Sequence, residues 1–102
     1  MSISSNLQTV TKTGAFTALA ISGRTRINGI YYTCNNTASV IHMHNNTTGA
    51  GTAQTSIYTP GAAGAYDIII PDMGLLFTNA VFLEFSANVL SVTLIFEGGA
   101  AA

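Results

Sequence analysis

Charged side chains are scarce in this chain. Lys, Arg, Asp and Glu together account for 7% of its 102 residues, where about 25% is usual. The usual means of keeping a monomer soluble is therefore missing. Hydrophobic residues make up 48%, which excludes the composition of a disordered chain. Because interface cores are depleted in charge, we expect a folded domain whose surface is largely covered by neighbouring molecules.

Several other features are also missing. With three basic residues and a formal net charge of −1, the chain lacks the clustered Lys and Arg that neutralise phosphates in nucleic-acid binding. No run approaches the roughly 18 consecutive apolar residues of a membrane span. The N-terminus has no basic stretch followed by an apolar run, as a secretory signal would. We expect a protein made in a cytoplasm, with neither nucleic acid nor membrane as partner.

Cysteine occurs once, at Cys34, so no intrachain disulfide can form, and we interpret this residue as a small buried apolar side chain. The chain has the length of a common domain and can build one hydrophobic core without disulfides or metal. We therefore expect a single domain over 1–102, with a short N-terminal arm and a Gly/Ala C-terminal tail at 98–102.

Apolar residues alternate or form short β-branched runs, and none keeps a helical period for three turns. The pattern predicts strands at 7–13, 15–21, 24–34, 38–44, 52–59, 65–70, 75–78, 80–86 and 89–96. Ser22-Gly23 is expected as a turn, Gly29 as a bulge, and 71–74 as the clearest turn. Strands at this spacing predict an all-β, single antiparallel β-sandwich, jelly-roll-like, of eight or so short strands, with an up-and-down barrel as the alternative.

Core positions are predicted where large apolar residues share a phase within one strand. They are Ile68, Ile70, Val81, Leu83, Phe85, Leu90, Val92, Leu94 and Phe96. Asp67 and Glu84 are then expected on the opposite faces of their strands. In the 24–34 strand, the same alternation places Arg24, Arg26, Asn28, Ile30 and Tyr32 on one face, with Ile27, Gly29 and Tyr31 on the other.

No arrangement typical of catalysis is present. A nucleophile motif such as G-x-S-x-G is missing, the four acidic residues are isolated, and no Lys or helix follows the glycines as in a phosphate loop. We expect no enzyme activity, no catalytic residues and no cofactor.

His42 and His44 are two residues apart, which on a strand places both imidazoles on one face about 6 to 7 Å apart. This spacing suits a shared metal ion, but a zinc site needs a third protein ligand that the sequence does not identify. We interpret the pair as part of a polar exposed or interface face. A cupin-like metal enzyme built on these two histidines is kept as an alternative.

Tyrosines and arginines are the candidates for a partner interface: Arg24, Arg26, Tyr31, Tyr32, Tyr58 and Tyr66. Tyrosine is favoured on sheet surfaces and in interfaces, although the same rings could stack on sugars in a lectin-like module. The two arginines are expected to pair with Glu84, to pair with a carboxylate of a neighbouring subunit, or to be solvated edge charges.

Four segments occur in a suggestive order: RTRINGIYY at 24–32, a strand ending in Thr59-Pro60, IIIPDMGLLF at 68–77, and SVTLIF at 91–96. Together they resemble a group of small structural proteins of tailed bacteriophages. The histidine pair is not part of that pattern.

The resemblance implies a non-enzymatic virion component, foremost a capsid cement or decoration protein, or a small subunit of a neck, tail or fibre. The implied partners are the major capsid protein, neighbouring virion proteins and further copies of the chain, with a trimer favoured. The alternative is a carbohydrate-binding module or the receptor-binding part of a phage tail or fibre.

Overall fold

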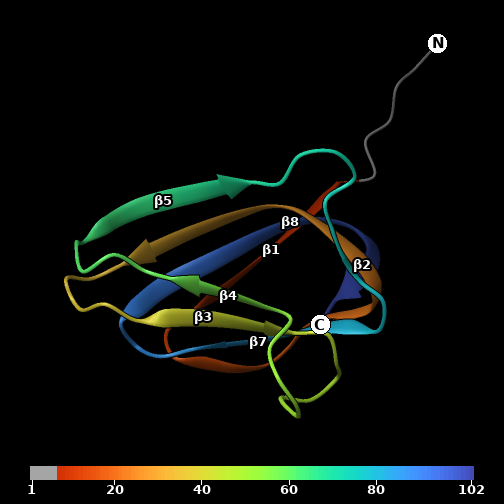
Figure 1. Cartoon of the computed structure of the whole chain (residues 1–102), viewed down its shortest axis with the longest axis horizontal. Helices are drawn as coiled ribbons and strands as arrows, with labels where there is room; N and C mark the ends of the chain where they lie inside the picture. Colours follow the sequence, from red (N-terminus) through yellow and green to blue (C-terminus); the bar gives the residue numbers. More distant parts are fainter. Residues whose placement is uncertain (1–6) are drawn as a thin grey trace.

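A computed structural model describes residues 7–102 as an all-β fold (Figure 1). Its strands are β1 (Gln8–Thr13), β2 (Phe16–Cys34), β3 (Val40–His44), β4 (Thr55–Tyr58), β5 (Gly64–Ile69), β6 (Leu75–Phe77), β7 (Ala80–Phe85) and β8 (Val89–Ala101). Every pairing is antiparallel. The predicted all-β antiparallel sandwich is confirmed, whereas the predicted N-terminal arm at 1–6 lies outside the described residues. Across 7–102 there is no helix of the length and apolarity that a membrane crossing requires.

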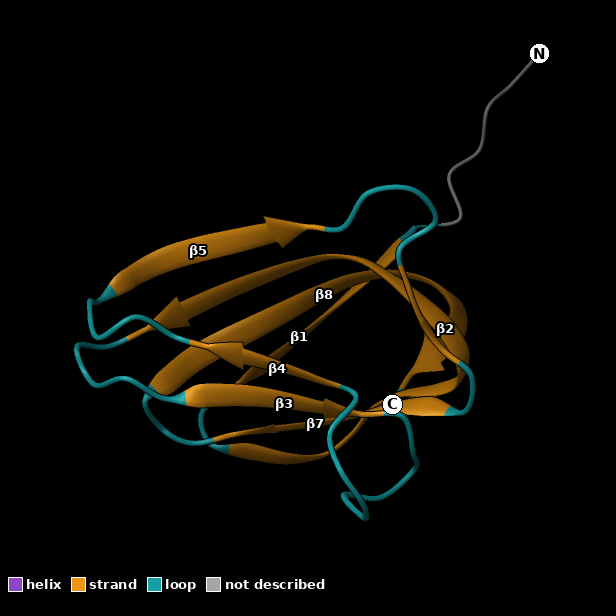
Figure 2. Ribbon diagram, in the orientation of Figure 1, coloured by secondary structure: helices purple, strands orange, loops and turns teal. Residues whose placement is uncertain are grey.

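The strands form one continuous sheet that folds over itself into two layers. Hydrogen bonds link them in the order β1-β8-β2-β7-β3-β4, and β5 and β6 also pair with β2. One layer consists of β1, β8, the second half of β2, and β5 with β6. The other consists of the first half of β2, β7, β3 and β4. In Figure 2, β4 crosses in front of β8 and β1 in the view.

β2 connects the layers because it is 19 residues long and continues through the predicted turn at Ser22-Gly23. Its first half pairs with β7 from Phe16 to Ser22, and from Thr25 it pairs with β8 and β6. The β2–β8 register shifts between Ser22 and Thr25, so the expected turn is instead a bulge. Partner strands are available on both sides of this point, and the chain bends from one layer into the other without reversing.

The predicted tail at 98–102 is also corrected, since β8 runs to Ala101 and its end pairs with Ile21 and Ser22. Two residues allow this close pairing: Gly98 and Gly99, which have φ values of 75° and 57°. A Cβ atom at Gly98 would lie 2.8 Å from the carbonyl oxygen of Arg24. Only glycine fits both the left-handed backbone and the approach of β2.

Bulges reverse the alternation of inward and outward side chains at two places. Prediction of the buried face from regular alternation is wrong at both. The β2–β8 register shifts between Ile27 and Gly29, which confirms the predicted bulge. Beyond it, Ile30 and Tyr32 face the core with Ile27, not the outside with the arginines. In β8, Cys34 pairs with Val89 and Thr33 with Ser91, so the extra residue Leu90 points outward and is 51% exposed. Its predicted core position is therefore wrong.

A single core fills the space between the layers. The remaining core predictions hold: Val81, Leu83, Phe85, Val92, Leu94 and Phe96 are exposed by 3% or less, and Ile68 and Ile70 pack against them while partly buried. Cys34 is buried as expected. Asp67 and Glu84 lie on the outward faces, as alternation requires.

Because Phe96 faces the core and Leu90 faces solvent, we expect these two residues of β8 to contribute differently to stability. Phe96→Ala removes a fully buried ring and is expected to lower the free energy of unfolding by about 3–5 kcal/mol. Leu90→Ala on the same strand changes an exposed side chain and should alter it by only about 0.5 kcal/mol. Urea unfolding of both variants checks this, and similar losses for the two would contradict the assignment of Leu90 to the surface.

Candidate functional site

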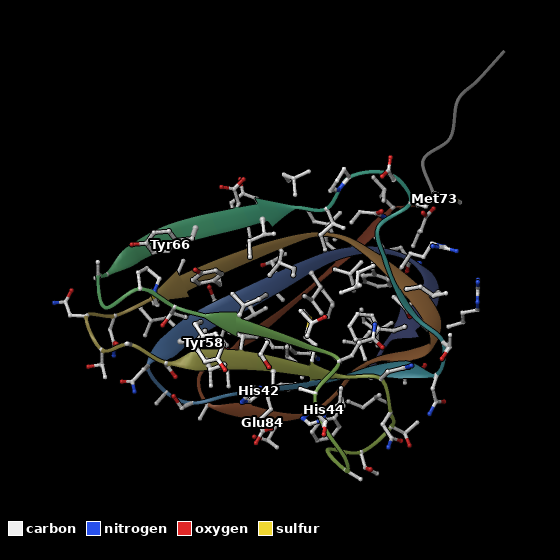
Figure 3. The ribbon with its side chains drawn as sticks, viewed as in Figure 1. His42, His44, Tyr58, Tyr66, Met73 and Glu84 are labelled. Carbon is white, nitrogen blue, oxygen red and sulfur yellow. The ribbon has the colours of Figure 1, made fainter. Side chains whose placement is uncertain are left out.

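The two histidines lie together on the outer face of the β4-β3-β7 layer, as their spacing predicts (Figure 3). Their ring centroids are 6.3 Å apart. His42 Nδ1 and Ser56 Oγ of β4 form a hydrogen bond of 2.8 Å, and His44 Nε2 lies 3.4 Å from Glu84 Oε1 of β7. The strand registers pair His42 with Ser56 on one side and with Glu84 on the other. Three strands thus bring imidazole, hydroxyl and carboxylate groups into one cluster.

His44 is buried in this cluster, with 6% of its surface exposed. Its ring meets the edge of Phe82 at 5.9 Å, and its Nδ1 is buried without a hydrogen-bond partner. An unpaired buried nitrogen costs stability. The other ring nitrogen, Nε2, lies 3.4 Å from Glu84 Oε1 and makes a long hydrogen bond to this half-exposed carboxylate.

The loop after β3 covers His44 and forms one wall of a pocket. Its first residue, Asn45, donates a hydrogen bond from Nδ2 to Thr78 Oγ1 and accepts one from the Asn79 backbone at Oδ1. Further along, Gly49 lies so close to Phe82 that a Cβ atom would be 3.0 Å from the ring. Asn45 thus anchors the loop to the turn before β7, and Gly49 packs against β7 itself.

The pocket between this loop and the sheet has a volume of about 380 Å³ and opens to solvent. It is lined by His42, His44, Gly49, Gly51, Thr52, Ala53, Ser56 and Glu84. Within residues 7–102, no three His, Cys, Asp or Glu side chains are grouped so that they could hold a metal ion. The fold therefore places no third metal ligand beside His42 and His44 in the described residues, as the cupin-like alternative would need.

The outer face of the other layer has a different character. Strand registers align three rows of side chains across β1, β8, β2 and β5, and we call this surface the hydroxyl face. The rows are Thr13, Ser91, Thr33 and Ala65; Thr11, Thr93, Tyr31 and Asp67; and Thr9, Ile95, Gly29 and Ile69. Asp67 is the single charged residue among these twelve. Hydroxyl pairs bridge the strands, with Thr11 and Thr93 2.8 Å apart and Thr33 and Ser91 2.6 Å apart.

The four tyrosines predicted for an interface occupy different environments. Tyr31 and Tyr58 are 52% and 75% exposed, on the outer faces of opposite layers. Tyr32 is buried and stacks on Tyr66 with ring centroids 5.4 Å apart. Tyr66 donates its hydroxyl hydrogen bond to the Ala62 carbonyl. Tyr32 thus belongs to the core and presents no surface to a partner, and Tyr66 supports the loop before β5.

Arg24 and Arg26 line a shallow depression with Thr25, Met73, Glu97 and Gly98. Glu84 does not pair with them, because it lies on the other layer beside His44. There, the His44 imidazole lies 3.4 Å from a Glu84 carboxylate oxygen. Pairing of either arginine with a neighbouring subunit's carboxylate stays a prediction.

Sequence reasoning found the histidine pair but not its partners. Alternation places Glu84 on an outward face, yet nothing local indicates that β7 and β4 flank β3. Comparison with known protein families, curated proteins and solved structures finds no match to this chain.

The buried tyrosine predicts a loss of stability at alkaline pH. Burial raises the pKa of the Tyr32 hydroxyl above its ordinary value, and Cys34 and Tyr66 raise it further. A raised folded-state pKa stabilises the fold below the unfolded value of about 10, and this contribution is lost as pH rises through the folded value. Tyr32→Phe should therefore lose less stability than the unaltered chain between about pH 8 and about pH 11.

Unfolding free energies from urea titrations at both pH values measure this difference. Tyr31→Phe, which changes an exposed hydroxyl, is the matched control and should follow the unaltered chain. An unchanged alkaline slope in Tyr32→Phe would refute the assignment.

Proposed function

We propose that this protein is a non-enzymatic structural component of a tailed-phage particle, foremost a cement or decoration protein that stabilises the shell. The hydroxyl face is the observation that carries the proposal. It spans four strands with one charged side chain, and Tyr31 and Ile69 protrude from it with more than half of their surface exposed. Exposed apolar and aromatic side chains in a surface depleted of charge are typical of interface cores.

The energetics of burying this face favour association. Two of its hydroxyl pairs are already hydrogen bonded to each other, so covering them leaves fewer polar groups without partners. Its threonines are short and β-branched, with little rotamer freedom to lose. An interface with so few charges depends weakly on salt.

Further support comes from the sequence resemblance to phage structural proteins over residues 24–97. On this proposal the protein is located in the virion and contacts the major capsid protein, neighbouring virion proteins and copies of itself, with a trimer favoured. Many copies each making a modest contact would together stabilise the particle. The direct test is co-purification of the chain with assembled particles, with its copy number determined.

Charge placed on the hydroxyl face is expected to abolish assembly. Ile69→Lys puts an ammonium group at an exposed position, where the folded monomer tolerates it but a covered interface does not. The number of copies bound per purified particle should fall at least about tenfold. Tyr58→Lys, on the other layer, is the matched control and should bind as the unaltered chain.

Sedimentation over micromolar concentrations measures self-association of the same variants, and circular dichroism checks their folding. A folded Ile69→Lys variant that still joins particles and oligomers at full occupancy would overturn the proposal.

A further inference from the structure

The pocket on the β4-β3-β7 layer presents polar groups that already contact one another. Ser56 is hydrogen bonded to His42, and Glu84 lies 3.4 Å from the buried His44. Glu84 remains about half exposed, at 45% of its side chain, so its carboxylate is available to a ligand. The pocket therefore offers hydrogen-bond donors and acceptors side by side.

The chemistry of the lining selects a class of ligand. Imidazole, hydroxyl and carboxylate groups line it beside Gly49, Gly51 and Ala53, which disfavours a purely apolar molecule. An anionic ligand would face the negative Glu84, and a metal ion would find too few ligands among residues 7–102. A neutral molecule with several hydroxyl groups satisfies these conditions, because each hydroxyl both donates and accepts.

Tyr58 adds a platform beside these polar groups. It follows Ser56 by two residues on the same face of β4, a separation of about 7 Å along the strand. Its ring is 75% exposed and is therefore accessible to a ligand. Figure 3 shows Tyr58, His42 and Glu84 gathered on one side of the molecule. A tyrosine ring has a broad apolar face and a polar tip, which suits the carbon-bound hydrogens and hydroxyls of a sugar ring.

We propose that this pocket binds a neutral saccharide, with Tyr58 stacking against a sugar ring and Ser56, His42 and Glu84 bonding its hydroxyls. Its volume of about 380 Å³ is at the small end of the range for ligand sites, which favours one or two sugar units. The pocket and the hydroxyl face lie on the outer faces of opposite layers. A chain attached through the hydroxyl face would present the pocket away from its support, but saccharide binding does not depend on that attachment.

The test begins with the full-length chain, fluorescently labelled, on an array of neutral and acidic glycans. The strongest ligand is then titrated by calorimetry against the unaltered chain and four variants. Tyr58→Ala and Glu84→Gln should each weaken the association constant at least about tenfold. Tyr31→Ala and Asp67→Asn make the same chemical changes on the hydroxyl face and should stay within about twofold.

Three results would overturn the proposal: no glycan bound by the folded chain, equal losses in the control variants, or loss of binding when EDTA removes metal ions. If Glu84→Gln fails to fold, Ser56→Ala takes its place. Ile69→Lys should keep saccharide binding while losing assembly, and Tyr58→Ala should do the opposite. Failure of one function can therefore be distinguished from failure of the other.

Discussion

Backbone hydrogen bonds from β2 reach four other strands, and both layers depend on them. Its first half pairs with β7, and its second half lies between β8 on one side and β5 and β6 on the other. The strand bends between the layers at the bulge near Ser22 and Gly23, where it contacts β7 and the end of β8 together. The core can close on itself because one uninterrupted segment contributes to both of its walls.

From that arrangement the two outer faces acquire separate properties. The layer built on the second half of β2 presents aligned rows of mostly uncharged side chains, with two hydroxyl pairs hydrogen bonded to each other. On the opposite layer, the loop after β3 forms one wall of a pocket, and the His44 imidazole contacts the Glu84 carboxylate there. The twelve residues of the hydroxyl face thus include one charged side chain, Asp67, whereas the pocket on the opposite layer combines Glu84 with two imidazoles and a hydroxyl.

Much of the fold could be predicted from the sequence because strand positions depend on local alternation and turn residues. The failures have a common cause: a bulge reverses the phase, and its position is set by the partner strand. For this reason regular alternation predicts Leu90 in the core and Tyr32 on the face of the arginines, whereas Leu90 is exposed and Tyr32 is buried. The end of β8 looked like a tail because two glycines usually terminate a strand, yet here they permit close contact with β2. Of the pocket, the histidine pair could be found from spacing, but Ser56 and Glu84 join it only through non-local pairing.

The solitary thiol of Cys34 has a practical consequence. Its sulfur is buried at the end of β2 and points at the carbonyl of Ala62, in the segment between β4 and β5. A thiol reagent in solution reaches it only when that segment lifts or the two layers separate. The rate of labelling at this one atom therefore measures how often either opening occurs, and any molecule that holds both the segment and the layers closed will slow it.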